Sequence, residues 1–220
     1  MSTIACIFAH PDDEAFGPGG TIATLARSHS VYIVCATPGD AQNGPAGLGE
    51  IRSLELQKSA KILGVREVIF LNFHDGNLCN NNYHALAKAI QKRLDKLRPD
   101  TLLTFEPQGV SGHIDHIVVT MVTSYLFERL AYTKKLMYFC HTVEQVKIIR
   151  KIVLDYFIYF PPGYPKDDIG KTIDTSPVWD IRKRAIQQHV SQKDDIEFIM
   201  KIHEKLPREE HFLVWEKATV

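Results

Sequence analysis

The sequence predicts one α/β domain, residues 1–220, with a Rossmann-like, mostly parallel sheet and helices on both faces. Short apolar runs typical of buried strands alternate along the chain with segments whose apolar residues recur at helical spacing. The chain has 220 residues and is 45% hydrophobic, which suits one full core and leaves little room for a second. In folds of this class, functional residues cluster at the carboxyl ends of the strands.

The first strand is predicted over residues 3–9, which are apolar or β-favouring throughout. His10 should be its last residue, because a residue before proline favours extended geometry. Pro11 then turns the chain. The next helix begins near Gly20, where apolar residues start to recur at helical spacing.

The remaining elements follow from the same two periodicities and from signals that end helices. Gly64 should cap one helix, and Pro99 should end the next one. Residues 37–49 are glycine-rich and lack periodicity, so we interpret them as a loop that forms a wall of the site. Further strands are predicted at 31–36, 67–72, 101–105 and 136–140, with an edge strand at 153–160. Further helices are predicted at 50–63, 82–97, 117–131, 144–151, 177–189 and 194–205.

The composition argues against several classes of partner. Acidic and basic residues balance at 26 each and form no basic block, so neither nucleic acid nor an anionic membrane is expected to bind. The four cysteines lack a C-x-x-C pattern and fit small buried residues in a reducing compartment. With no signal-like or membrane-spanning stretch, the protein is expected to be cytoplasmic and without a membrane partner. The sequence leaves the oligomeric state open, and a homo-oligomer is compatible with it.

A histidine and three acids follow the first strand directly, as His10, Asp12, Asp13 and Glu14. Consecutive carboxylates at the end of a buried strand are unfavourable unless a cation or donors compensate them. His10 and Asp13 could converge on a divalent metal such as zinc. The same residues equally fit a core histidine followed by two aspartates that cap a helix. A dinucleotide site is excluded, because the turn lacks the G-x-G-x-x-G pattern and its carboxylates would repel pyrophosphate.

A second group of histidines and acid follows the fourth strand, in the segment that contains His113, Asp115 and His116. The two histidines are spaced i, i+3 at a predicted helix start, so both can face one way. They lie on the same rim of the predicted sheet as His10, and this coincidence favours a metal site. Two histidines and one carboxylate leave coordination positions open, which is typical of a catalytic metal.

Two motifs resemble the PIG-L/LmbE family of metal-dependent N-acetylglucosaminyl deacetylases. They are A-H-P-D-D-E at residues 9–14 and G-H-I-D-H at residues 112–116. Weaker agreement occurs at residues 50–55, 75–76 and 189–192, so the resemblance spans most of the chain. The second motif has Ile114 where proline is usual, and Ser111 lies where some members carry a tyrosine.

The resemblance implies a role for each candidate residue. It makes His10, Asp13 and His116 the ligands of a zinc ion, with another divalent metal such as Fe2+ as the alternative. It further implies Asp12 as general base, His113 facing the substrate carbonyl, Asp115 orienting a histidine, and Arg52 and Asp75 holding sugar hydroxyls. From the residues alone, Arg52 would instead form a surface ion pair with Glu55, and Asp75 would be a turn former.

The expected function is therefore a zinc-dependent N-deacetylase that acts on an N-acetylglucosamine-containing small molecule or glycoconjugate. One alternative is an amidase for a non-sugar N-acyl metabolite or a thiol conjugate. The other is a metal-binding module without turnover, which is disfavoured because it has no use for Asp12 and His113.

Overall fold

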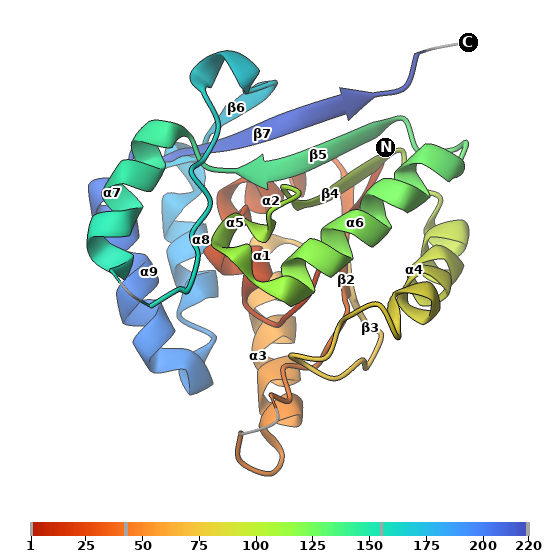
Figure 1. Cartoon of the computed structure of the whole chain (residues 1–220), viewed down its shortest axis with the longest axis horizontal. Helices are drawn as coiled ribbons and strands as arrows, with labels where there is room; N and C mark the ends of the chain where they lie inside the picture. Colours follow the sequence, from red (N-terminus) through yellow and green to blue (C-terminus); the bar gives the residue numbers. More distant parts are fainter. Residues whose placement is uncertain (1, 42–43, 155, 219–220) are drawn as a thin grey trace.

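The computed structural model describes residues 2–41, 44–154 and 156–218. Its described residues build a seven-stranded sheet in the order β3-β2-β1-β4-β5-β7-β6 (Figure 1). The first five strands pair in parallel, whereas β7 runs antiparallel to both β5 and β6. The predicted α/β class with a mostly parallel sheet is therefore confirmed.

The elements have the following bounds. The strands are β1 (Thr3–Phe8), β2 (Ser30–Cys35), β3 (Glu67–Phe70), β4 (Thr101–Phe105), β5 (Lys135–Cys140), β6 (Lys171–Asp174) and β7 (Glu209–Glu216). The α-helices are α1 (Asp13–Phe16), α2 (Gly19–Leu25), α3 (Leu48–Leu63), α4 (Tyr83–Leu97), α5 (Gly109–Gly112), α6 (Ile114–Arg129), α7 (Val143–Val153), α8 (Trp179–Ile186) and α9 (Lys193–Lys205). Short 3₁₀ helices are η1 (Lys166–Asp168), η2 (Ser176–Val178) and η3 (Val190–Gln192).

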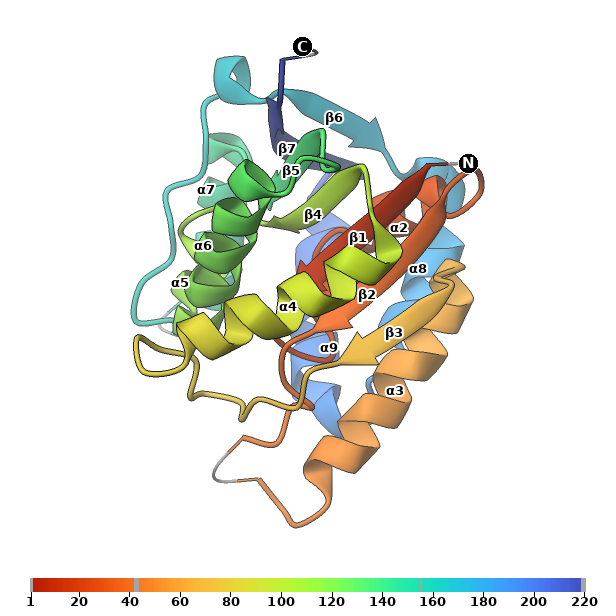
Figure 2. The same cartoon turned by 90° about the vertical axis from the view of Figure 1, so that its right-hand side faces the viewer.

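Helices cover both faces of the sheet, with α4 and α6 on one face and α3 and α8 on the other (Figure 2). Successive residues of β1 point to opposite faces, so Cys6 and Phe8 pack toward α3 and α8 while Ala5 and Ile7 pack toward α4 and α6. A fully buried side chain of this size contributes roughly 1.5–3 kcal/mol. Burial of both faces explains why the central strands read as continuous apolar runs.

The predicted edge strand at 153–160 is wrong. Val153 ends α7, and no strand occurs at residues 156–160 of the described chain. Its aromatic residues Phe157 and Phe160 pack instead on a small core cluster between α7 and α9. A composition rich in aromatic residues favours a strand locally, but packing against two helices decides the outcome here.

Three further expectations concern single positions. Gly64 ends α3 with a φ of 83°, as predicted, because a left-handed residue lets the helix close its last carbonyls. β1 ends at Phe8, so His10 lies beyond the strand and is not its last residue. Cys79 is exposed, whereas the other three cysteines are buried as expected.

Among the described residues, the structure contains no helix with the length and apolarity that crossing a membrane requires. A cytoplasmic location and a homo-oligomeric state stay predictions.

Candidate metal centre and active site

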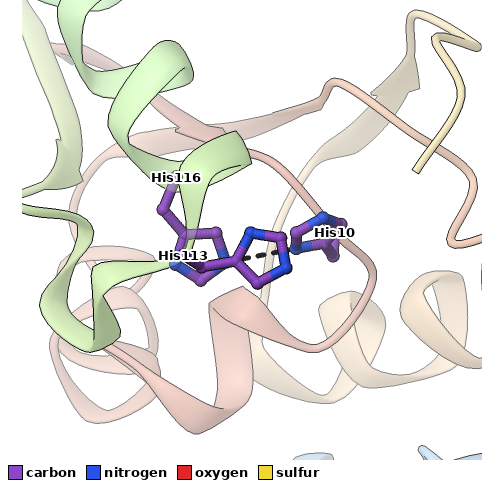
Figure 3. A group of neighbouring side chains, drawn as sticks. All are labelled: His10, His113 and His116. Atoms are coloured by element: carbon purple, nitrogen blue, oxygen red, sulfur yellow. Dashed lines mark hydrogen bonds between the residues drawn. The ribbon is translucent and has the colours of Figure 1, made fainter. Parts of the chain in front are cut away.

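The candidate residues converge at the carboxyl edge of the sheet. His10 and Asp13 follow β1, whereas His113 and His116 lie at the start of α6, which follows β4. Strand order reverses between β1 and β4, because β2 lies on one side of β1 and β4 on the other. Open α/β sheets bind ligands in the crevice outside such a switch point. Figure 3 shows the three imidazole rings gathered there.

The three predicted metal ligands are mutual neighbours. His10 Nδ1 lies 3.1 Å from His116 Nε2, which in turn lies 3.2 Å from Asp13 Oδ1. The distance from His10 Nδ1 to Asp13 Oδ2 is 4.0 Å. Burial opposes the charge on Asp13, but the adjacent imidazoles of His116 and His10 hold the pKa of this carboxyl well below its usual range.

The outer nitrogens of both imidazoles face oxygen acceptors. His10 Nε2 lies 3.0 Å from Asp75 Oδ1 and 3.2 Å from Asp115 Oδ2, and His116 Nδ1 lies 3.1 Å from the Gly109 carbonyl. These contacts assign the outer nitrogens as N–H donors and leave the inner nitrogens as acceptors. Two inner lone pairs 3.1 Å apart repel unless a proton or a cation lies between them.

The donor set therefore fits a divalent metal. Burial opposes a charge on His10, yet Asp115 and Asp75 raise its pKa to about 10, so the site attracts positive charge. Two imidazoles and a carboxylate suit zinc and related metals. Ligand atoms of His10, His113 and His116 also lie within 4.8 Å of one another, as do those of His10, Asp75 and Asp115. The second set is less suited, because its carboxylates already accept N–H groups.

Asp12 is held beside the imidazoles by side chains from distant segments. Its carboxylate accepts hydrogen bonds from Arg52 Nη2 at 3.2 Å and from Gln192 Nε2. It occupies the N-cap position of α1 but its side chain makes no capping hydrogen bond, so the helix-cap interpretation is wrong for Asp12. Its φ of 135° is unusual for a residue other than glycine and costs about 1–3 kcal/mol. Burial and the charge of Asp13 raise the pKa of Asp12 to about 6, which suits a general base.

Arg52 and Asp75 contact the catalytic candidates directly. Arg52 is 9% exposed and its guanidinium bridges Asp12 and Asp75, with Nη1 3.3 Å from Asp75 Oδ2. The surface ion pair between Arg52 and Glu55 is wrong, since Glu55 is also buried and accepts hydrogen bonds from Ser191. Asp75 is no mere turn former, because its carboxylate orients His10.

His113 and Asp115 have distinct positions. His113 caps α6, with Nδ1 accepting the Asp115 backbone N–H at 3.2 Å, so its Nε2 carries the proton of the neutral ring. Desolvation lowers the pKa of His113 to about 4, and the neighbouring His10 and His116 act in the same direction. The Asp115 carboxylate is buried against His10 and accepts the N–H groups of Gly76 and Leu78, which suits a residue that orients a histidine.

Sequence reasoning missed a buried group behind Asp12. Glu14 is 1% exposed and accepts the Asp12 N–H at 3.1 Å, the Ser59 hydroxyl, and a hydrogen bond from His189 Nε2 at 2.8 Å. His189 lies between α8 and η3, and Gln192 is the last residue of η3. The only sequence signal for them was the weak agreement at residues 189–192.

Of the predicted site residues, all except Asp115 border one cavity of about 440 Å³, which is within the range of small-molecule sites. His10, Asp12, Asp13, His113 and His116 line one part of it. The structure thus defines an α/β protein with a histidine and carboxylate centre at its switch point.

The matching family model is PIG-L, described as GlcNAc-PI de-N-acetylase, and it covers residues 5–126. The chain belongs to this family.

The chain matches two relatives over different shares of their length. A probable N-acetylglucosaminyl-phosphatidylinositol de-N-acetylase of Schizosaccharomyces pombe is 34% identical over 124 residues, which are 53% of this chain and 48% of the relative. The chain therefore spans about half the length of that protein. A 1D-myo-inositol 2-acetamido-2-deoxy-alpha-D-glucopyranoside deacetylase of Thermobifida fusca is 24% identical over 237 residues, covering 84% of this chain and 82% of the relative.

Solved structures agree with the fold. An N,N'-diacetylchitobiose deacetylase from Pyrococcus horikoshii superposes with a TM-score of 0.74 at 21% identity, covering 98% of this chain and 84% of that one. GalB, a 4-carboxy-2-hydroxymuconate hydratase from Pseudomonas putida, superposes with a TM-score of 0.70 at 16% identity, covering 100% and 99%. Because the fold serves more than one reaction, the activity has to be argued from the site.

Proposed function

We propose that this protein is a metal-dependent N-deacetylase that hydrolyses the acetamide of an N-acetylglucosamine-containing small molecule or glycoconjugate. The observation that carries the proposal is the pair of inner imidazole nitrogens of His10 and His116, 3.1 Å apart beside the Asp13 carboxylate, with Asp12 next to them. Family membership supports the same reaction, and the names of the relatives support the substrate class.

His10, Asp13 and His116 would hold the metal, which we propose to be zinc, with Fe2+ as the alternative. A divalent metal there supplies Lewis acidity, which acidifies a water molecule and polarises the amide carbonyl. The proton transfers and the hydrogen bond to the substrate carbonyl would come from the side chains around the metal.

Asp12 would accept the proton of the attacking water. With a pKa of about 6 it is mostly ionised at neutral pH, yet basic enough to take a proton. Arg52 and Gln192 fix the direction of its carboxylate. His113 would donate its Nε2 proton in a hydrogen bond to the carbonyl oxygen as negative charge develops there.

The leaving amine needs a proton, and we propose that Asp12 returns the one it accepted. Because the pKa of His113 is lowered to about 4, its imidazolium is scarce at neutral pH, and a neutral ring serves better as a hydrogen-bond donor. Arg52 and Asp75 border the cavity, so we propose that a sugar hydroxyl contacts one of them in addition to their bonds with Asp12 and His10.

The proposal is tested by amine release from methyl N-acetylglucosaminide, with N-acetylated amino acids as the non-sugar comparison. The protein is assayed as purified, after chelation, and after the addition of Zn2+ or Fe2+. We expect hydrolysis of the sugar, loss on chelation and recovery with metal. Turnover of only the non-sugar amides would favour the amidase alternative, and no turnover at all would favour a metal-binding module.

A further inference from the structure

The cavity extends from the metal centre into an apolar chamber between α7 and α9. Six residues define this chamber, namely Phe139, Ile149, Phe198, Ile199, Ile202 and Leu206. Helices α7 and α9 pack against each other at one end of the sheet (Figure 1). Several of these side chains belong to the core cluster between the two helices, so the chamber is a built part of the fold.

The chamber and the polar groups lie on opposite sides of the metal centre. The centre is at β1 and β4, in the middle of the sheet. Arg52 and Asp75 come from α3 and from the segment after β3, on the β2 and β3 side. The chamber is built by β5, α7 and α9. Helix α7 follows β5 in the chain and α9 precedes β7, and both strands lie on the other side of the metal centre.

Among the ionisable residues that line the cavity on this side, Asp195, Arg208 and Glu209 are partly or fully exposed to solvent, and the others add no net charge. Arg182 and Glu210 form an ion pair of 2.9 Å and are each less than 5% exposed. Burial lowers the pKa of His141 to about 4 and that of His203 well below its ordinary value, so both rings are neutral at neutral pH. An apolar ligand can therefore occupy the chamber without burying an uncompensated charge.

We propose that the chamber binds the acyl part of the substrate, and that it lets the enzyme accept aliphatic acyl groups longer than acetyl as well as acetyl itself. The inference rests on the proposed function. A scissile amide at the metal centre has its amine-bearing sugar on one side and its acyl group on the other. Sugar hydroxyls need polar partners, which the Arg52 and Asp75 side offers, and the acyl group then projects into the chamber. The reaction is still hydrolysis, in which the amide C–N bond breaks, a C–O bond forms with water, and a carboxylic acid and an amine result.

The test is a series of methyl glucosaminides that carry N-acetyl, N-butanoyl, N-hexanoyl or N-octanoyl groups. Each methylene that leaves water changes kcat/KM by up to about fourfold, so a rise of at least about tenfold from acetyl to hexanoyl is expected. A flat or falling series overturns the acyl assignment. A parallel arm uses octyl N-acetylglucosaminide, and a comparable rise in that arm alone places the aglycone in the chamber and also overturns it. If no member of either arm is hydrolysed, the proposed function fails as well.

A matched pair of variants on α9 tests the location. Ile199 and Ile196 are both half-buried and pack on the same core cluster, but only Ile199 borders the cavity. In Ile199→Trp, the ratio of hexanoyl to acetyl kcat/KM should fall at least tenfold, because the larger ring fills the chamber. Ile196→Trp should keep the wild-type ratio. Equal ratios in both variants contradict the location, and the wild-type series decides the question if either variant fails to fold.

Discussion

At the scale of single residues, the site combines a strained aspartate with donors that hold it. Asp12 has positive φ, and its N–H is accepted by Glu14 while its carboxylate is held by Arg52 and Gln192. Backbone strain persists only where the surroundings over-determine the geometry. The buried network behind Asp12 therefore serves to orient one carboxylate toward the proposed metal centre.

Arg52→Lys tests this positioning role. Lysine keeps the positive charge but lacks the planar fork that bridges Asp12 and Asp75, so kcat should fall about 10- to 100-fold, and any rise in KM would report a contact between Arg52 and a sugar hydroxyl. Steady-state kinetics on the best substrate measures both constants. Arg66→Lys, at an exposed position, is the control. A normal kcat, whatever the change in KM, would show that Arg52 does not position Asp12.

At the scale of elements, the local patterns predicted the parallel half of the sheet well and the antiparallel half poorly. The apolar runs of β1, β2 and β4 and the cap at Gly64 are local signals, and all were predicted. β7 was missed because its sequence E-E-H-F-L-V-W-E carries charges at both ends and gains its stability from pairing with β5. Pairing between distant segments leaves no local pattern.

The same reason limits prediction of the site. His10, Asp13 and His116 belong to two compact motifs, so their convergence could be predicted from sequence. Gln192 reaches Asp12 across 180 residues of sequence, and His189 reaches Glu14 across 175. These residues reach the site only because α8 and η3 pack on α1 and α3. The spacing of residues along the sequence does not predict this packing.

A buried ion pair joins α8 to the sheet and gives the element-scale prediction. Arg182 binds Glu210 of β7 and also donates to the carbonyls of Ala15, Phe16 and Gly17. Arg182→Met leaves Glu210 buried without its partner, so the free energy of unfolding should fall by about 3–5 kcal/mol. Urea denaturation followed by circular dichroism measures it.

The control for this prediction is the adjacent, exposed Lys183. Lys183→Met should change the free energy of unfolding by less than about 0.5 kcal/mol. A loss below about 1 kcal/mol in Arg182→Met would contradict the role of the ion pair.

At the scale of the whole molecule, the cavity spans the switch point between β1 and β4, with Arg52 and Asp75 on one side and the chamber on the other. The proposed metal centre lies between them, where loops from both halves of the parallel sheet meet. Because the proposed ligands come from the segment that follows β1 and from α6, metal binding would tie together segments that are distant in sequence. A ligand that binds only the folded state then stabilises the whole domain.

Metal binding should therefore raise the thermal midpoint. At a Zn2+ concentration 100 times the Kd, the folded state gains about 2.7 kcal/mol, which corresponds to a rise of roughly 5–10 °C for a domain of this size. Differential scanning calorimetry of chelated and reloaded protein measures the rise, and metal analysis should give about one ion per chain. His116→Ala should lose both effects, whereas His84→Ala, an exposed histidine away from the site, should retain them. Full occupancy in His116→Ala would exclude His116 as a ligand.

The central claim is that Asp12 is the general base of a metal-dependent deacetylase, and amine release by metal-loaded Asp12→Asn tests it most directly. Asparagine keeps the size of the side chain and its contacts but cannot take a proton, so metal content should match the wild type. Turnover of methyl N-acetylglucosaminide, or of the best member of the acyl series, should fall about 100- to 10,000-fold. Equal turnover by wild type and Asp12→Asn at equal metal content would contradict the account.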